Sequence, residues 1–201
     1  MTDIELIQQS LANSYTYEDY RALVAQLAAD KATTGVDQKE SLINYTLLND
    51  KRMARWDKKI EVSSDDQAKI KAFDKEILWL VLTESWCGDA SPALPVMNKI
   101  ATLNSKIDFR IILRDTNLEL TDRFLTNGAR SIPKLIMVDK KSNEVIGQWG
   151  PRPSIATKMV ADYKKEHGTL TPEFKQDLQV WYNKNKGENI FEGLLGLLAL
   201  K

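Results

Sequence analysis

The sequence predicts an α/β fold in which one mixed four-stranded sheet is flanked by helices, in the order β-α-β-α-β-β-α. A continuous apolar run at 77–82 is typical of a central strand that is covered on both faces. Before this run the chain shows helical spacing, and after it short apolar segments alternate with helical ones. The turn-like segment 140–143 separates two short strands and predicts an antiparallel hairpin.

The N-terminal part, residues 1–74, is expected to form a helical arm that packs on the core. Apolar residues occupy one face of its first clear helix: Tyr20, Leu23, Val24, Leu27 and Ala28. A break at 33–35 ends that helix, and a second one is expected from about 38 to 59. Basic residues cluster between 51 and 59, and we interpret them as a solvated helix face. A capping segment at 63–66 predicts a short third helix.

The core is expected to span residues 75–168 and to start with the strand at 77–82. A helix should follow from near Cys87 to Asn104, with Pro95 kinking it. The later elements are expected as a strand at 107–113, a short helix at 118–125, strands at 135–138 and 145–149, and a helix at 155–166. The first two strands, joined through a helix, should be parallel, and the last two should be antiparallel.

A C-terminal helical extension is expected over residues 169–201, so that arm, core and extension form one structural unit. Phe174, Leu178 and Trp181 fall on one face of a helix that starts at Pro172. The leucine-rich tail at 194–200 adds apolar surface, which either packs on its own domain or joins two copies of the chain. The sequence leaves the oligomeric state open.

The amino-acid composition argues against several classes of partner and favours one cellular compartment. The chain has 201 residues, with 28 Lys and Arg against 28 Asp and Glu, so we expect neither nucleic acid nor an anionic membrane as a main partner. No stretch approaches the roughly 20 apolar residues of a membrane span, and the N-terminus lacks a secretory signal. A single cysteine fits a reducing compartment, so we expect a cytoplasmic protein.

The chemistry of the chain centres on Trp86-Cys87-Gly88-Asp89-Ala90, which follows the apolar strand. A helix N-terminus offers free N–H groups and partial positive charge, and both favour the thiolate of Cys87. The carboxylates of Glu84 and Asp89 oppose this by like-charge repulsion, unless Asp89 caps the helix instead. Two interpretations remain open at this point: Cys87 is an activated nucleophile, or it is an inert cysteine.

The motifs from 77 to 150 resemble the thioredoxin superfamily. Trp86-Cys87-Gly88 is similar to the start of its active site, Pro95 to its helix-kinking proline, the segment 127–135 to the one that carries its cis-proline, and Gly150 to a glycine after the last strand. Together with the helical arm, the motif resembles a bacterial group of thioredoxin family proteins that carry a monothiol Trp-Cys-Gly-Asp sequence. The resemblance implies a thioredoxin-like fold and possible redox chemistry.

Two departures from the family pattern narrow the chemistry. The position of the second, resolving cysteine holds Ala90, so no internal disulfide can form. The position six residues before Cys87, where the family has a buried acid, holds Val81. Dithiol reductase activity is therefore excluded, and any disulfide on Cys87 must be resolved by an external thiol.

The resemblance implies Cys87 as the catalytic residue and Trp86, Gly88, Ile132 and Pro133 as substrate-binding residues. A cis Pro133 would leave the Ile132 backbone free to pair with an extended substrate, although it can also serve only as a turn that builds the fold. Trp86 can offer an apolar contact to a partner or simply pack at the sheet edge.

Other candidate residues carry weaker signals. Arg130 can bind an anionic group such as a glutathione carboxylate or can be a solvated charge. Arg114 and Asp115 are interpreted as ordinary surface charges. His167, the only histidine, is expected near a helix end, away from Cys87. No residues show metal-ligand spacing, so neither a metal nor a resident cofactor is expected.

Two functions remain open. The first is a monothiol oxidoreductase or redox-responsive protein whose partner is a protein, glutathione or another low-molecular-weight thiol or disulfide. The second is a non-catalytic binding module that uses the groove between Trp86 and Pro133. The sequence alone does not decide whether the protein is an enzyme.

Overall fold

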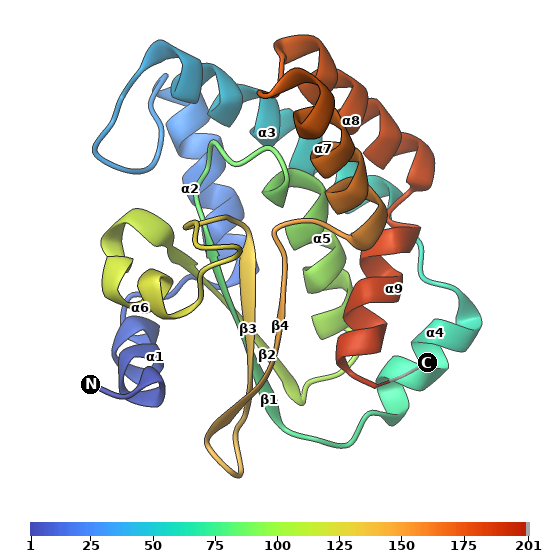
Figure 1. Cartoon of the computed structure of the whole chain (residues 1–201). Helices are drawn as coiled ribbons and strands as arrows, with labels where there is room; N and C mark the ends of the chain where they lie inside the picture. The colour runs from blue at the N-terminus through green and yellow to red at the C-terminus, as the bar shows by residue number, and fades with distance from the viewer. Residues whose placement is uncertain (200–201) are drawn as a thin grey trace.

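The computed structural model describes residues 1–199, and a four-stranded mixed sheet lies at its centre (Figure 1). The strand order is β2-β1-β3-β4. The strands are β1 (Ile77–Thr83), β2 (Ile107–Leu113), β3 (Lys134–Asp139) and β4 (Glu144–Trp149). β1 pairs with β2 in parallel and with β3 in antiparallel orientation, and β3 and β4 form an antiparallel hairpin. The predicted β-α-β-α-β-β-α order and both predicted strand orientations are confirmed.

Strand β1 is the buried centre of the molecule. All seven of its residues are buried, as its continuous apolar sequence predicts, because β2 and β3 pair with its edges and helices cover both faces. In Figure 1, α1 and α6 lie on one side of the sheet and α5 and α9 on the other. Strand β4 is the edge strand, and its residues alternate between exposed and partly buried. α9 packs closely on it, since a Cβ on Gly147 would meet Leu197 Cδ1 at 2.6 Å.

The helices of the arm and the extension surround this sheet. The helices are α1 (Asp3–Leu11), α2 (Tyr17–Ala29), α3 (Glu40–Lys59), α4 (Ser64–Ala72), α5 (Ala90–Ala101), α6 (Leu118–Arg123), α7 (Ser154–His167), α8 (Pro172–Asn185) and α9 (Glu188–Leu197). The boundary between α1 and the rest of the arm, and the helix α9, were not predicted from the sequence. Helix α5 begins at Ala90, later than the predicted start near Cys87, since Cys87 lies in a turn where its N–H donates to the Glu84 carbonyl at 3.0 Å.

The C-terminal extension packs on the protein's own core. Phe174 and Leu178 of α8 are buried, as are Leu194, Leu195 and Leu198 of the tail. α9 contacts β4, α5 and α7. Of the two interpretations of the tail, packing on its own domain is therefore the one that residues 194–199 show, while Leu200 lies outside the described residues.

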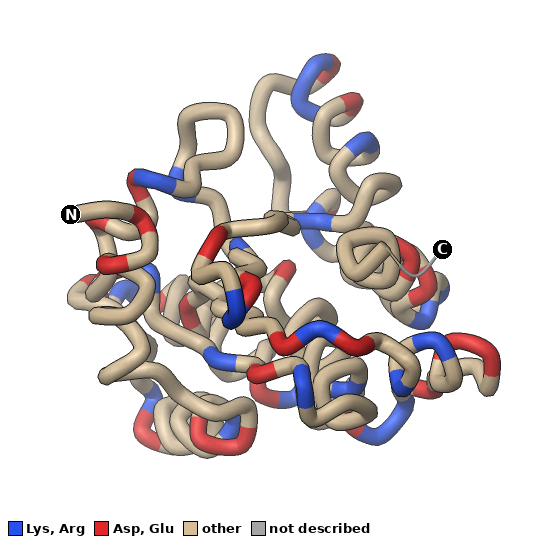
Figure 2. Tube along the Cα trace, turned by 90° about the horizontal axis from the view of Figure 1, so that it is seen from below, with Lys and Arg blue, Asp and Glu red and all other residues tan. Residues whose placement is uncertain are grey.

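Charged residues of both signs are interspersed along the chain, as Figure 2 shows, in keeping with the balance of 28 basic and 28 acidic residues. Within residues 1–199, no helix combines the length and the apolar character that crossing a membrane requires.

A buried polar cluster fastens the arm to the loop that carries Cys87. The Ser85 hydroxyl lies 2.8 Å from Thr46 Oγ1 and 3.1 Å from Thr33 Oγ1, and it accepts the Thr34 N–H at 3.0 Å. Asn49 of α3 donates its amide to the Ser85 carbonyl at 2.9 Å. Since all these groups are buried, each depends on the others for its hydrogen bonds. The arm thus positions the segment immediately before Cys87.

Replacing Ser85 with Ala should lower the free energy of unfolding by about 1–3 kcal/mol, because the buried Thr34 N–H then loses its acceptor. Chemical denaturation measures this loss. Ser142→Ala, in the exposed hairpin turn, is the matched control and should change little. Equal stability of the two variants would contradict the role given to the cluster.

Candidate functional site

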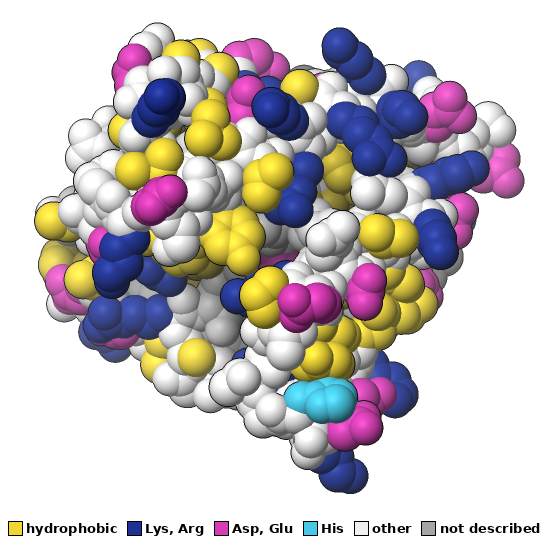
Figure 3. Space-filling model, turned by 90° about the horizontal axis from the view of Figure 1, so that it is seen from above, with side chains coloured by type: hydrophobic (Ala, Val, Ile, Leu, Met, Phe, Trp, Pro, Cys, Tyr) yellow, Lys and Arg dark blue, Asp and Glu magenta, His cyan; other side chains and the backbone are white. Residues whose placement is uncertain are grey.

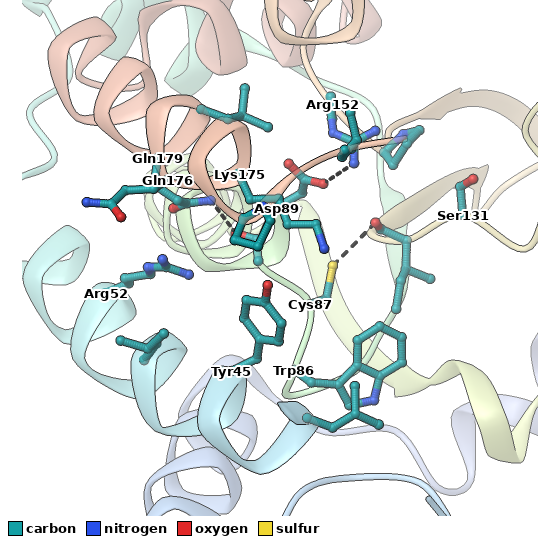
Figure 4. Close-up of a pocket in the computed structure, with 18 of the residues that line it drawn as sticks. Tyr45, Arg52, Trp86, Cys87, Asp89, Ser131, Arg152, Lys175, Gln176 and Gln179 are labelled. Atoms are coloured by element: carbon teal, nitrogen blue, oxygen red, sulfur yellow. Dashed lines mark hydrogen bonds and ion pairs between the residues drawn. The ribbon is translucent and has the colours of Figure 1, made fainter. Parts of the chain in front are cut away.

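Cys87 lies in the turn between β1 and α5, beside the segment that contains Pro133. Its Sγ donates to the Ile132 carbonyl at 3.3 Å, and only 6% of the residue is exposed (Figure 4). The Ile132–Pro133 peptide bond is cis, as the resemblance implies. The fold therefore brings Cys87 next to Ile132 and Pro133, two predicted site residues about 45 positions away in the sequence.

Gly150 shapes the same region from the end of β4. Its φ of 110° falls where side chains are strained, and a Cβ there would overlap the Pro133 carbonyl. The chain after β4 can therefore approach the Pro133 turn only with glycine at this position. The predicted importance of Gly150 has a steric basis in this contact.

The thiol of Cys87 is held in its protonated form. Burial and the neighbouring Asp89 carboxylate raise the pKa of Cys87 to about 12. The N–H groups of Ala90 and Asp89, together with Arg152, act in the opposite direction. Of the opposing effects on the Cys87 pKa, desolvation and the Asp89 carboxylate therefore outweigh the helix N-terminus.

Asp89 is an internal ion-pair partner rather than a helix cap. Its side chain makes no capping hydrogen bond to α5. It pairs with Arg152 Nη2 at 2.6 Å and accepts the Tyr182 hydroxyl at 3.1 Å, with 11% of its side chain exposed. Burial raises the pKa of Asp89, while Arg152 and Tyr182 oppose that rise. Asp89 therefore joins the Cys87 motif to the loop after β4 and to α8.

Trp86 contacts an arginine that the sequence analysis treated as an ordinary surface charge. The guanidinium carbon of Arg114 lies 4.9 Å from the Trp86 ring centroid, a cation–π contact. Arg114 also pairs with Asp115 at 2.7 Å, and the Asp115 N–H donates to Glu84 Oε1 at 2.8 Å. The surface interpretation of Arg114 and Asp115 is therefore corrected: both support the loop that holds Cys87.

A pocket of about 870 Å³ opens over the motif, and the hollow is visible in the centre of the face shown in Figure 3. Trp86, Cys87, Gly88 and Ile132 line it, whereas Pro133 is buried. The other lining residues are Leu42, Tyr45, Leu48, Arg52, Asp89, Arg114, Arg130, Ser131, Pro151, Arg152, Lys164, Leu170, Pro172, Lys175, Gln176, Leu178 and Gln179. Much of the pocket wall thus comes from α3 and α8, which lie outside residues 75–168, the expected core.

These wall residues were not predicted from the sequence, and Arg52 does not lie where it was expected. Arg52 belongs to the basic cluster at 51–59, which we interpreted as solvated, yet it lines the pocket and is half-buried. The one indication in the sequence that Arg52 faces the pocket is its spacing. Tyr45, Leu48 and Arg52 lie on one face of α3 at i, i+3 and i+7. His167, by contrast, ends α7 as expected and packs its ring 4.2 Å from that of Tyr163.

Comparison with known proteins identifies the family. Residues 35–164 match the family model described as Thioredoxin, and because this match spans more than half of the chain, the protein belongs to that family. A protein of unknown function from Pseudomonas aeruginosa is similar in structure, with a TM-score of 0.58 and 16% identity over 92% of this chain and 96% of that one.

A crystal structure of an HIV epitope-scaffold is also similar, with a TM-score of 0.56 and 17% identity over 88% of this chain and 95% of that one. At such identities both neighbours show the fold alone. No curated protein matches the chain.

Replacing Asp89 with Asn should lower the pKa of Cys87 from about 12 toward the ordinary thiol value of 9.0, because a negative charge next to the thiolate is removed while Arg152 remains. The pH dependence of alkylation by iodoacetamide reports this pKa. Asp65→Asn, in the exposed first turn of α4, is the control and should leave the profile unchanged. A Cys87 profile that is the same in both variants would refute the electrostatic coupling.

Proposed function

We propose that the protein carries out monothiol thiol–disulfide exchange through Cys87, and that it is a redox member of the Trp-Cys-Gly-Asp subgroup. The observation that carries the proposal is the position of the sole thiol at a ligand-sized pocket, 3.3 Å from the carbonyl before cis-Pro133. The Ile132 N–H donates to no group within residues 1–199, so it is available to an extended partner.

The exchange runs in two steps. Cys87 loses its proton to solvent, and its thiolate attacks one sulfur of a disulfide, so that a Cys87 mixed disulfide forms and the other sulfur leaves as a thiolate. Because residue 90 is Ala, an external thiolate then attacks the partner's sulfur in the mixed disulfide, so that a new disulfide joins the external thiol to the partner and Cys87 leaves as a thiolate. Glutathione or another low-molecular-weight thiol serves as this reductant, and the reducing cytoplasm is the compartment that supplies it.

Because Cys87 is buried, the access of a partner to its thiol controls the exchange. A thiol with a pKa of about 12 holds little thiolate near neutral pH, so the partner must displace the contact between Cys87 and Ile132 before exchange. A substrate that pairs with the Ile132 backbone would do this, since it competes for the same carbonyl. Trp86 and Gly88 then border the bound disulfide.

A second candidate function is a binding module in which Cys87 stays reduced. The raised pKa of Cys87 favours this alternative, because a protonated thiol is a poor nucleophile. The pocket would then bind its ligand without covalent chemistry. The two functions differ in whether the folded protein forms an adduct.

Incubation of the folded protein with oxidised glutathione should add one glutathione to the wild type and none to Cys87→Ser, as measured by intact mass. An adduct that forms only in denaturant would reject exchange and favour the binding module. Wild type unfolded in urea is the control for the presence of a competent thiol.

A further inference from the structure

The pocket over the motif carries an excess of positive charge. Six basic residues line it, and Asp89 is the only acidic one: Arg52, Arg114, Arg130, Arg152, Lys164 and Lys175. The whole chain, in contrast, has equal numbers of basic and acidic residues. The excess of basic side chains is therefore a local property of this pocket and does not reflect the overall composition of the chain.

Three of the six already have carboxylate partners. Arg152 pairs with Asp89 at 2.6 Å, Arg114 with Asp115 at 2.7 Å and Arg130 with Asp122 at 2.6 Å. The remaining three have no carboxylate within ion-pair distance among residues 1–199: Arg52, Lys164 and Lys175. Their charges are available to a ligand.

Arg52 is the most informative of these three. Its one side-chain hydrogen bond within residues 1–199 goes from Nη1 to Asn49 Oδ1 at 3.1 Å, and burial lowers its pKa. A methyl group added at Gly88 would lie 3.9 Å from Arg52 Nη1, so the guanidinium lies beside the residue that follows Cys87. The Asp89 carboxylate acts on Arg52 and opposes the lowering of its pKa, but it forms its ion pair with Arg152, so Arg52 has no carboxylate within ion-pair distance among residues 1–199. A partly desolvated cation without a direct ion pair is unfavourable, and an anion bound there would reduce that cost.

Lys175 enters the same pocket from α8, across from Arg52 on α3 (Figure 4). Its Nζ lies 5.9 Å from the Tyr45 ring centroid. The wall that carries it is fixed to the motif, because Gln179 Nε2 donates to the Gly88 carbonyl at 3.2 Å. Two charges on opposite, anchored walls are suited to a ligand with more than one anionic group.

We propose that the pocket between α3 and α8 binds a small molecule with two or more oxyanion groups, carboxylates or phosphates, through Arg52 and Lys175. A volume of about 870 Å³ is in the range of small-molecule sites. This binding goes beyond the proposed exchange, because it is non-covalent and does not use the Cys87 thiol. A carboxylate ligand and a phosphate ligand share this chemistry, and the choice of probe separates them.

Isothermal titration of the full chain with citrate and, separately, with inorganic tripolyphosphate tests the proposal at constant ionic strength. We expect saturable binding of at least one probe to the wild type. Arg52→Gln and Lys175→Gln should each weaken binding about tenfold, the loss expected for one charge-assisted contact. Arg55→Gln and Lys184→Gln are exposed controls on the same two helices and should bind like the wild type.

Binding of citrate alone identifies a carboxylate ligand, and binding of tripolyphosphate alone a phosphate ligand; either supports the site. The proposal is overturned if neither probe binds, or if Arg52→Gln and Lys175→Gln bind as tightly as Arg55→Gln and Lys184→Gln. Thermal melts of the four variants establish that each is folded. Adduct formation on Cys87 is measured separately, so failure of exchange leaves this result unaffected.

Discussion

The buried carboxylate of Asp89 is the group on which the rest of the site depends. It comes two residues after Cys87, yet its partners are Arg152, after the last strand, and Tyr182, on the C-terminal extension. Removing one member of such a buried pair typically costs about 3–5 kcal/mol, because the other is left uncompensated. One short side chain thereby joins the motif, the core and α8.

The same carboxylate governs the chemistry of the thiol. Its charge and the burial that it shares with Cys87 both favour the protonated thiol, and they outweigh the N–H groups at the start of α5. Asp89 thus anchors the wall of the pocket through Arg152 and Tyr182. The same carboxylate and the burial of Cys87 leave its thiol protonated and therefore weakly nucleophilic. Because residue 90 is Ala, the exchange that we propose needs an external thiol to resolve the mixed disulfide.

Local patterns were sufficient to predict the sheet and much of the motif. The apolar run of β1 and the turn before β4 each act through neighbouring residues, so they can be recognised in sequence. The cis-proline at 133 was expected from the resemblance to the thioredoxin superfamily. The partners of Asp89 could not be predicted from the sequence. Tyr182 lies 93 positions away from Asp89, and only the packing of α8 brings it near. The inward direction of Arg52 likewise depends on the helix that faces α3. Burial of Cys87, which raises its pKa, is also a property of the assembled walls.

The central claim is that Asp89 holds α8 against the Cys87 motif. Native-state hydrogen exchange of wild type and Asp89→Ala tests it most directly, since exchange reports local opening of each helix separately. The account predicts faster exchange in α8, while amides of β1 change only as much as the global stability does. Protection of α8 that falls no more than that of β1 would contradict it.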